Sequence, residues 1–560
     1  MRTTPRDLLR RPLGSAQRAL YKSMGHSDDD LARPIIGLAN AHSTLVSGHA
    51  NLRAVAAAVR RGVEHAGGMA VEFGVAGICD GLADHHLGAH YTLPSREVVA
   101  AAVEMMVRGH ALEGIVLLGS CDKIVPGMLM AAARLDVPAI MIVGGPAEGG
   151  VEFQGHASDS SSPDDALALL ESGEMDEAAF IALEDGCQPG CGSCAYLGTA
   201  NSMCCAAEAM GMSLPGSATI PATDASRLHA GEATGERIVR LVAAGDGARA
   251  IMTPAAVGNA VRTMAAIGGS TNTVLHLMAI AGEAGHTMTI DDFAALWSTT
   301  PQVARVNPAG PATVPDFHRA GGIPAVMRAI RPLLDCSART VTGRRLGDDL
   351  EDVALPAPGN EVIRGLDDPW LDGGGLAVLR GNLAPDSGIT RPAAFPPGMH
   401  TFTGRALCFD TERHANEAIL EGRVGPGTVV VIRYVGPRGG PGMPEMYAPM
   451  KYLAARGLGA DAAIVTDGRF SGTNNGCFVG HVCPEAALGG PIALVRDGDE
   501  ITVDVPAGAL RLHVDETEMA RRREAWRPRP SGEVPPGMLR LYARLAGPAA
   551  RGALMELEGT

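Results

Sequence analysis

GIVLLGSCDKIVPG, residues 114–127, joins an apolar run to a turn that carries three reactive side chains in succession. The run 114–118 predicts a buried β-strand, and the thiol of Cys121, the carboxyl of Asp122 and the amine of Lys123 follow its end. Buried charged groups are costly unless they are paired or bound to a metal. A strand end that presents all three groups therefore predicts a functional site rather than part of the core.

The lysine in this turn stands out against the composition of the chain. Lys and Arg together number 47, yet the lysines are only Lys22, Lys123 and Lys451. Arg cannot be deprotonated in a protein, whereas a buried Lys can. A lysine retained here indicates chemistry that needs a neutral amine: carbamylation by CO2, Schiff-base formation or proton transfer. A stray lysine in an ion pair is the alternative.

Strands and helices alternate through the first part of the chain. Predicted strands cover residues 34–39, 74–78 (a short strand or a loop), 114–118 and 139–143, and predicted helices cover 52–66, 95–108 with Ser95 as N-cap, and 127–135. This alternation predicts an α/β fold with a mostly parallel sheet. Ligands of such sheets bind beyond the carboxyl ends of the strands, where Cys121, Asp122 and Lys123 lie.

A change of composition to Gly, Asp and Pro around residues 367–375 predicts a domain boundary. We therefore expect a large N-terminal α/β domain over residues 1–370 and a smaller β-barrel-like domain over residues 371–560. The second domain is predicted from short strands separated by turns, at residues 377–379, 404–409, 428–434, 462–466, 491–495, 501–505 and 510–514.

Charge and hydropathy narrow the class of protein. The net charge of −15 argues against a nucleic-acid partner or an anionic membrane partner, and no apolar run reaches membrane-spanning length. The N-terminal segment lacks the apolar centre of a signal peptide, so a cytoplasmic enzyme is expected. Eleven cysteines, seven of them between residues 79 and 205, then indicate metal or Fe–S ligation or buried thiols rather than disulfides.

Four long motifs resemble the dihydroxy-acid and sugar-acid dehydratases, a family that includes dihydroxy-acid dehydratase and 6-phosphogluconate dehydratase. They are GSCDKIVPGMLM (119–130), CGSCAYLGTANSM (191–203), GPRGGPGMPEM (436–446) and TDGRFSGTNNGCFVGHVCPE (466–485). The shorter stretches YTLPSREV (91–98) and IGGSTNTVLHL (267–277) also fit. The resemblance extends from about residue 34 to residue 504, and several long motifs in one order make it specific.

The resemblance implies the loss of water from a small 2,3-dihydroxy carboxylic acid to give a 2-keto acid. The family uses an iron–sulfur cluster and Mg²⁺. Its iron acts as a Lewis acid on the leaving 3-hydroxyl, its Mg²⁺ holds the carboxylate and the 2-hydroxyl, and a serine alkoxide removes the C2 proton. The family pattern further implies a homodimer or a dimer of dimers.

Several residues of this sequence match the family's magnesium site and base. Asp80, Asp122 and Glu445 match its Mg²⁺ carboxylates, Lys123 matches its carbamylated lysine, and Ser471 matches its base. The residue types suit these roles independently, because Mg²⁺ prefers oxygen ligands and a divalent cation stabilises charge that develops beside a carboxylate. A serine is a weak base until its proton is lost, which an adjacent cation favours.

The cluster ligands match the family only in part. Cys121 and Cys194 match two of its cysteines, whereas Gly48 stands where many members have the third. We expect Cys79, next to Asp80, to be the third ligand of a 2Fe–2S or 4Fe–4S cluster, with Cys191 as the competing candidate. Ser270 and Thr271 open a helix, so capping is the simple interpretation and an anion site for a substrate carboxylate or phosphate is the alternative.

Two other functions stay open at this point. A sugar-acid dehydratase, acting on an aldonate or phosphogluconate, is suggested by Gly48 and Cys79, whereas PGMPEM and residues 381–388 look most like dihydroxy-acid dehydratase. A non-catalytic Fe–S protein would be expected to lose Ser471, Lys123 or the carboxylates, and all of these are present.

Overall fold

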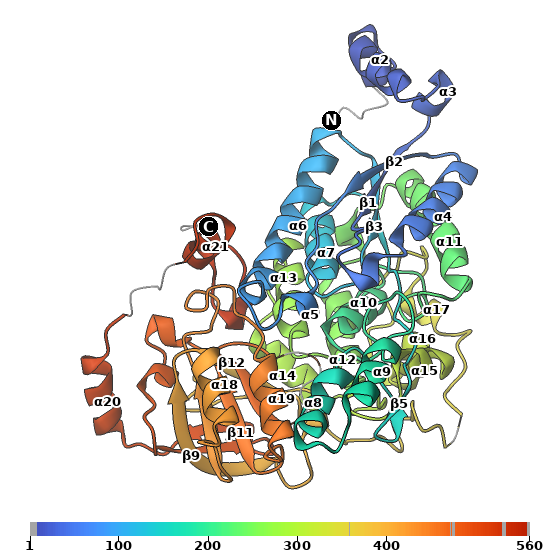
Figure 1. Cartoon of the computed structure of the whole chain (residues 1–560). Coiled ribbons are helices and arrows are strands. Elements are labelled where there is room, and N and C mark those ends of the chain that lie inside the picture. Colours follow the sequence, from blue (N-terminus) through green and yellow to red (C-terminus); the bar gives the residue numbers. More distant parts are fainter. Residues whose placement is uncertain (1–7, 358, 471, 473–475, 529–533, 557–560) are drawn as a thin grey trace.

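A computed structural model describes residues 8–357, 359–470, 472, 476–528 and 534–556 of the chain (Figure 1). Its N-terminal part is built on a four-stranded parallel sheet in the order β2 (Met69–Gly74), β1 (Ile35–Asn40), β3 (Gly114–Leu118) and β4 (Ala139–Ile142). Every residue of β1, β3 and β4 is buried, which explains their unbroken apolar runs.

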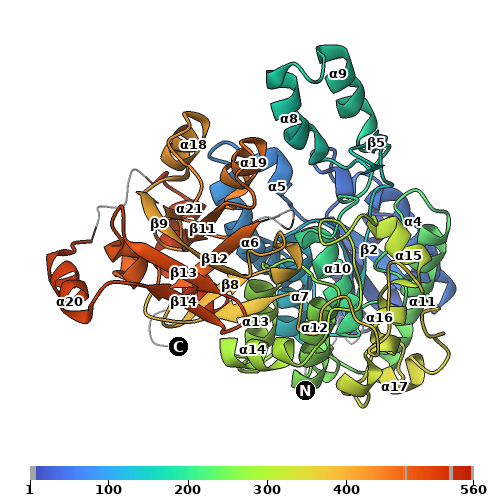
Figure 2. The same ribbon diagram turned by 90° about the horizontal axis from the view of Figure 1, so that it is seen from below.

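Helices cover this sheet on both faces (Figures 1 and 2). α4 (Leu52–His65) packs on α11 (Ser226–Ala244), and α6 (Ala89–Gly109) packs on α7 (Ile124–Leu135). Glycines allow the close crossing of α4 and α11, because a Cβ on Gly62 would lie 1.9 Å from the carbonyl oxygen of Glu232. A mainly helical region follows, with α10 (Thr199–Ala209), α12 (Pro254–Ala266) and α13 (Thr273–Glu283).

The C-terminal part contains an eight-stranded mixed sheet. Its order is β14 (Ala509–Leu512), β13 (Glu500–Asp504), β9 (Thr401–Phe409), β10 (Thr428–Ile432), β11 (Ala462–Thr466), β12 (Cys477–Cys483), β8 (Ser387–Thr390) and β7 (Ala377–Leu379). A bridge between Arg380, after β7, and Ala509, in β14, joins the two edges. The sheet therefore curls into a barrel, and the predicted fold class is confirmed.

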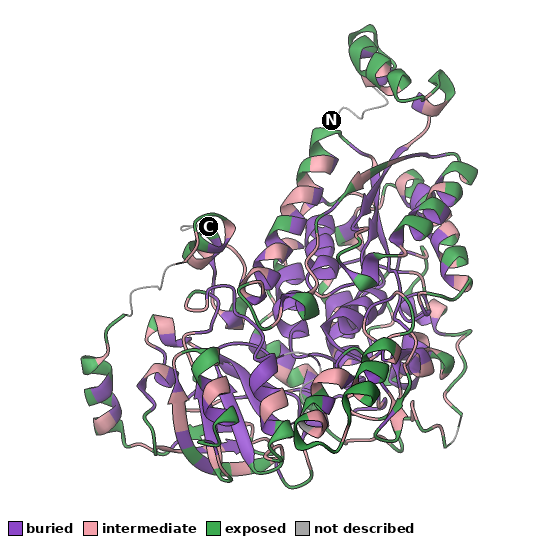
Figure 3. Cartoon of the chain, in the orientation of Figure 1, coloured by how far each residue is buried: buried purple, intermediate pink, exposed green. Residues whose placement is uncertain are grey.

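Side chains of this sheet alternate between two apolar cores. Val429 and Val431 of β10 face the interior of the barrel, whereas Val430 and Ile432 pack beneath α18 (Glu412–Leu420) and α19 (Tyr447–Ala455). Both layers are buried in Figure 3. Within the part of the chain that the structure describes, we find no helix with the length and apolar character needed to cross a bilayer.

Three local predictions were wrong or incomplete. Residues 491–495 form not a strand but the 3-10 helix η7 (Pro491–Leu494), which begins with a proline that has no backbone N–H for a sheet. In the two large sheets, the strands β8 and β12 were not predicted, and of β2 only its last residue, Gly74, was included in a predicted strand or loop. Ser95 is not an N-cap: α6 begins at Ala89, includes Pro94, and the Ser95 hydroxyl donates to the carbonyl of Thr92 at 2.6 Å. Of residues 74–78, left open between strand and loop, Gly74 ends β2 and 75–78 are a loop.

Candidate active site

The register of the parallel sheet brings three loops together. Asn40, the last residue of β1, pairs with Gly74 of β2 and Leu118 of β3, so these three strands end level with one another. The loops that follow carry Gly48, the pair Cys79 and Asp80, and residues 121–123 respectively. Segments far apart in the sequence thus meet at the carboxyl edge of the sheet, as expected for a parallel sheet.

Three carboxylates from this edge and from the barrel converge on one point. Asp80, Asp122 and Glu445 each offer an oxygen, and these oxygens lie within 4.8 Å of one another, close enough to hold a metal ion. Asp80 begins the short helix α5 (Asp80–Ala83), Asp122 follows β3, and Glu445 precedes α19. The Oδ1 atom of Asp80 is buried and has no hydrogen-bond partner, so it is available to coordinate a cation.

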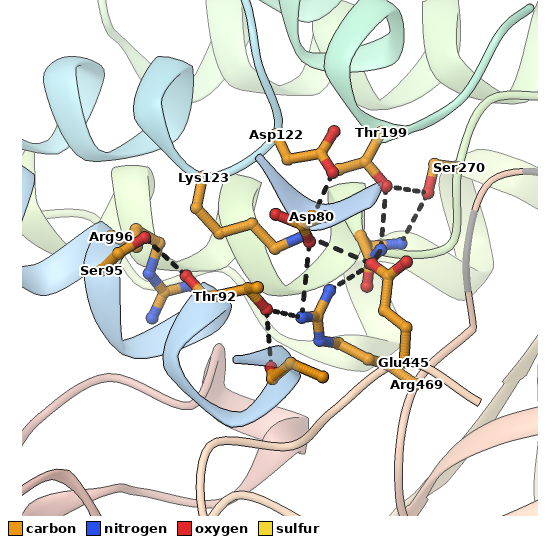
Figure 4. A network of polar contacts seen from close by, with 12 residues as sticks. Asp80, Thr92, Ser95, Arg96, Asp122, Lys123, Thr199, Ser270, Glu445 and Arg469 are labelled. Atoms are coloured by element: carbon orange, nitrogen blue, oxygen red, sulfur yellow. Dashed lines mark hydrogen bonds and ion pairs between the residues drawn. The ribbon is translucent and has the colours of Figure 1, made fainter. Parts of the chain in front are cut away.

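Lys123 lies at the centre of this group and is fully buried (Figure 4). Its Nζ pairs with Asp80, lies 3.2 Å from Oε1 of Glu445 and 3.7 Å from Oδ2 of Asp122. Burial and the nearby Arg469 lower the pKa of Lys123, but the three carboxylates raise it more, and the net shift is upward. The ammonium of Lys123 therefore supplies positive charge to the three carboxylates.

A second buried cation, Arg469, lies beside two of the three carboxylates. Its guanidinium pairs with Glu445, lies 3.7 Å from Oδ2 of Asp80, and donates to Oγ1 of Thr92 at 2.5 Å and to the carbonyl of Met443 at 2.6 Å (Figure 4). The sequence motifs contained Arg469, but its role was not predicted, because its partners are distant in the chain.

Asn272 links the acidic group to α10. Its Nδ2 donates to Oε1 of Glu445 and to Oγ1 of Thr199, both at 2.8 Å, and to the carbonyl of Phe470 at 3.2 Å. Thr199 in turn lies 2.9 Å from the hydroxyl of Ser270 (Figure 4). Asn272 was also missed by the sequence reasoning, although it belongs to the quoted IGGSTN stretch.

Ser270 and Thr271 do not cap α13 through their side chains, since Asn272 is the residue before its first turn. Ser270 instead belongs to the network around Thr199, whereas the buried hydroxyl of Thr271 has no hydrogen-bond partner. Their role as an anion site stays a prediction.

Burial of several acids at one place changes their protonation. Burial raises the pKa of Asp122 to about 7, and the neighbouring Asp80 adds to the shift. Burial, Glu445 and Asp80 raise the pKa of Asp84, just after α5, to about 8. Crowded carboxyls with raised pKa values are typical of sites where a cation binds or a proton moves.

Three thiols, those of Cys79, Cys121 and Cys194, lie close enough to Asp122 for its charge to raise their pKa values. Burial raises the pKa of Cys121 well above its ordinary value, and the thiols of Cys79 and Cys194 add to this shift. Burial likewise raises the pKa of Cys79 to about 11 and of Cys194 to about 12. The thiols are therefore near enough to influence one another, as joint ligands of one cluster must be. Cys191 lies in the same loop as Cys194 and is partly exposed.

Gly48 touches this thiol group directly. A Cβ on Gly48 would lie 2.6 Å from Sγ of Cys121 and 3.1 Å from the backbone nitrogen of Ser193. The adjacent His49 is fully buried, and its Nε2 accepts hydrogen bonds from the backbone nitrogens of Ser120 and Cys121, both at 3.1 Å. The loop after β1 therefore supports the turn that carries Cys121, and the thiol set suits an iron–sulfur cluster.

Ser471, the predicted base, lies outside the described residues. Its neighbours in the chain are described: Phe470 accepts from Asn272, and Gly472 accepts from Arg391 at 2.5 Å. Gly472 lies against Gly198, because a Cβ on Gly472 would be 2.3 Å from the Cα of Gly198.

Comparison with known proteins gives matches over nearly the whole chain. The family model described as "Dihydroxy-acid/6-phosphogluconate dehydratase N-terminal" matches residues 33–349, and the corresponding C-terminal model matches residues 361–553. The dihydroxy-acid dehydratase of Moorella thermoacetica is 46% identical over 541 residues, which cover 96% of this chain and 97% of the relative. That of Nitratidesulfovibrio vulgaris is 45% identical over 538 residues (96% and 97%), and that of Pyrococcus abyssi 46% over 551 residues (98% and 99%).

Proposed function

The chain belongs to the dihydroxy-acid/6-phosphogluconate dehydratase family, and we propose that it is a dihydroxy-acid dehydratase of the type used in branched-chain amino-acid biosynthesis. It is a dehydratase, a hydro-lyase that converts a 2,3-dihydroxy carboxylic acid to a 2-keto acid. The observation that carries this proposal is the meeting of three carboxylates and a buried lysine with three neighbouring thiols.

The acidic group is proposed to hold Mg²⁺ through Asp80, Asp122 and Glu445. The orphan oxygen of Asp80 and the short separation of the three carboxylates support this assignment. When bound, Mg²⁺ supplies positive charge that stabilises the negative charge developing on the substrate as its C2 proton leaves.

Lys123 is proposed to be carbamylated in the active enzyme. The ammonium first loses one proton to solvent, and the neutral amine then attacks CO2. An N–C bond forms as one C–O π bond of CO2 breaks, and the nitrogen gives up a second proton to solvent, so that the side chain changes from a cation to an anion. In the metal-free chain Lys123 pairs with Asp80 and lies 3.2 Å from Glu445. Carbamylation abolishes both contacts and adds a fourth negative group, so we expect it to proceed together with Mg²⁺ binding.

Cys121, Cys194 and Cys79 are proposed to hold the iron–sulfur cluster, either 2Fe–2S or 4Fe–4S. When bound, the cluster supplies a Lewis-acidic iron for the oxygen that leaves C3. The raised pKa values of these thiols mean that ligation releases protons. Gly48 cannot ligate, and the influence of Cys79 on the pKa values of both Cys121 and Cys194 supports Cys79 as the third ligand.

Different side chains of this protein are proposed to transfer the proton and to balance the charge. Ser471, as its alkoxide, accepts the C2 proton. The bond between C3 and its hydroxyl oxygen breaks, and the hydroxide takes a proton from solvent and leaves as water. The enol then takes a proton at C3, gives up its hydroxyl proton to solvent and becomes the 2-keto acid, and Ser471 returns its proton to solvent. Arg469 balances the charge of Glu445 and Asp80, while Asn272 orients Glu445. Ser270 and Thr271 are proposed to contact the substrate carboxylate.

A sugar-acid dehydratase is the second candidate, because polar groups lie beside the acidic group. The hydroxyl of Tyr447, two residues after Glu445, donates to Asp164 at 2.5 Å, and its ring meets that of His85 at 5.8 Å. Such groups could bind the hydroxyls of a polyol tail. The identity of about 45% to proteins named dihydroxy-acid dehydratase favours the first candidate.

An anaerobic assay of keto-acid formation tests both candidates. The reconstituted enzyme is offered 2,3-dihydroxyisovalerate, gluconate, arabinonate, xylonate and 6-phosphogluconate. Preferred turnover of 2,3-dihydroxyisovalerate supports the proposal, and preferred turnover of a sugar acid replaces it by the second candidate. No turnover of any of them, with cluster and Mg²⁺ present, would indicate a non-catalytic Fe–S protein.

On the family resemblance we propose a homodimer or a dimer of dimers. From the net charge of −15 we propose that the protein has no nucleic-acid or membrane partner, and we propose that it is a cytoplasmic enzyme. We also propose a domain boundary at residue 370, a few residues before β7 begins at Ala377.

A further inference from the structure

Arg391 is a buried arginine that bonds to the backbone on two sides of the proposed site. It follows β8 and has no exposed surface. One terminal nitrogen donates to the carbonyl of Gly472 at 2.5 Å and the other donates to the carbonyl of Gly268. Its Nε has no hydrogen-bond partner, and within the described residues Arg391 forms no ion pair with a carboxylate.

This arrangement differs from the other buried arginines near the site. Arg96 pairs with Glu97 at 2.8 Å, and Arg469 pairs with Glu445. Burial alone lowers the pKa of Arg391 to about 9, and no neighbouring acid offsets the shift. A buried charge without a counterion costs stability, and a neutral donor could bond the same carbonyls at less expense. The charge and the forked geometry of Arg391 therefore call for a reason other than stability.

The two carbonyls belong to segments that lead into the acidic group. Gly268 begins the turn that continues to Asn272, whose amide donates to Glu445 at 2.8 Å and to Phe470 at 3.2 Å. Gly472 is two residues after Phe470 and packs on Gly198, directly before α10. Asn272 thus holds the backbone before residue 471, and Arg391 holds the backbone after it.

We propose that Arg391 is a positioning residue of the dehydratase, whose guanidinium fixes Gly472 against the Gly268 turn and keeps a positive charge beside this backbone. The inference rests on the proposed function, because Gly472 directly follows the proposed base in the sequence. The planar fork of Arg391 bonds two carbonyls at once, which lysine cannot reproduce. A shift of Gly472 by about 1 Å is expected to slow the chemical step about 100-fold.

The test compares Arg391→Lys and Arg391→Met with the wild-type enzyme under anaerobic conditions. We expect Arg391→Met to lower kcat about 100-fold and Arg391→Lys to lower it about 10-fold, with KM changed less than about threefold in both. Iron, sulfide and Mg²⁺ contents should stay at the wild-type level. If Arg391→Met fails to fold, Arg391→Lys alone tests the inference, through a lowered kcat with a nearly unchanged KM.

Arg227 provides a matched control, because it is also buried and donates to the carbonyls of Ser217 and Ile220. Unlike Arg391, it has Glu208 and Asp224 near enough to offset part of the effect of burial on its pKa, which accounts for a structural role. Arg227→Lys should lower the unfolding temperature without lowering kcat. An Arg391→Lys variant with the wild-type kcat would overturn the inference. So would a variant whose loss of kcat is fully explained by loss of its cluster or metal. Failure of the proposed function is distinguishable, because the wild-type enzyme itself would then form no keto acid.

Discussion

The Nζ atom of Lys123 lies 3.2 Å from Oε1 of Glu445, although 322 residues separate them in the sequence. Lys123 follows a strand of the parallel sheet, and Glu445 lies in a loop of the barrel. Both side chains are buried, so separating the two parts of the protein would leave each charge without this partner. The proposed magnesium site therefore depends on the contact between the two parts of the chain.

Lys123→Arg tests the proposed carbamate. Arginine keeps the positive charge and can still pair with Asp80 and Glu445, but it does not form the carbamate. We expect the variant to fold and to bind the cluster, while its activity falls roughly 10³-fold. Native mass spectrometry should find the added mass of one CO2 on the wild-type enzyme and not on the variant. Lys451→Arg, at an exposed ion pair with Asp165, is the control and should keep full activity.

Cys79→Ser tests the third cluster ligand. We expect the variant to lose most of its iron and sulfide and to show an altered EPR spectrum, because the cluster would keep only Cys121 and Cys194. Cys191→Ser should retain a full cluster. Cys205→Ser, in the buried interior of α10, controls for the loss of any buried thiol. A stable, complete cluster in Cys79→Ser would disprove the assignment and favour Cys191 if that variant loses iron.

Magnesium binding is expected to weaken as the pH falls below about 7. Burial raises the pKa of Asp122 to about 7 in the metal-free chain, and a protonated carboxyl does not bind Mg²⁺. The dissociation constant should rise roughly tenfold per pH unit below this value and change little above it. Isothermal titration between pH 5.5 and 8.5 measures the effect. An affinity independent of pH over this range would contradict the role of Asp122.

The same shift has a consequence for the stability of the metal-free protein. The folded pKa of Asp122 lies above its ordinary value of 3.8, so its contribution to stability is present at low pH and is lost as the pH rises through about 7. Other buried acids, including Asp84 and Glu208, shift in the same direction. The prediction is therefore a difference: between pH 5 and 8, metal-free Asp122→Asn should lose less unfolding free energy than the wild type. Equal losses in denaturant titrations would contradict it.

Asn272→Ala tests the network that orients Glu445. The change removes the amide that bonds Glu445, Thr199 and the carbonyl of Phe470. We expect kcat to fall roughly 100-fold because the carboxylate of Glu445 and the backbone of Phe470 lose the hydrogen bonds that orient them. Asn259→Ala is a matched control, since buried Asn259 bonds the backbone of Asp335 away from the site. It should lower the unfolding temperature, whereas its kcat should equal that of the wild type.

The strands that carry a clear apolar pattern in the sequence were predicted correctly. The apolar runs 114–118 and 428–432 became strands, because burial on both faces leaves a continuous apolar run in the sequence. The segment 491–495 is equally apolar, but Pro491 directs it into a 3-10 helix. In α6, the helix continues through Pro94, so the start predicted at Ser95 came one and a half turns late.

Residues of the site could be predicted only where a family motif assigns them a role. Asp80, Asp122, Lys123 and Glu445 followed from family resemblance, and the structure brings them together. Arg469 and Asn272 stand in the same motifs, yet their importance arises from partners such as Thr92, 377 residues from Arg469. Contacts over such separations depend on how sheet and barrel dock, and a single sequence carries no local sign of them.

The formation of a 2-keto acid from 2,3-dihydroxyisovalerate in D2O tests the central claim most directly. The wild-type enzyme, anaerobically reconstituted and supplied with Mg²⁺ and CO2, should give a product with deuterium at C3, because the enol takes that proton from solvent. Lys123→Arg, with the same cluster content, should give almost none. A wild-type enzyme that holds cluster and Mg²⁺ but forms no keto acid, or equal rates in the two proteins, would contradict the account.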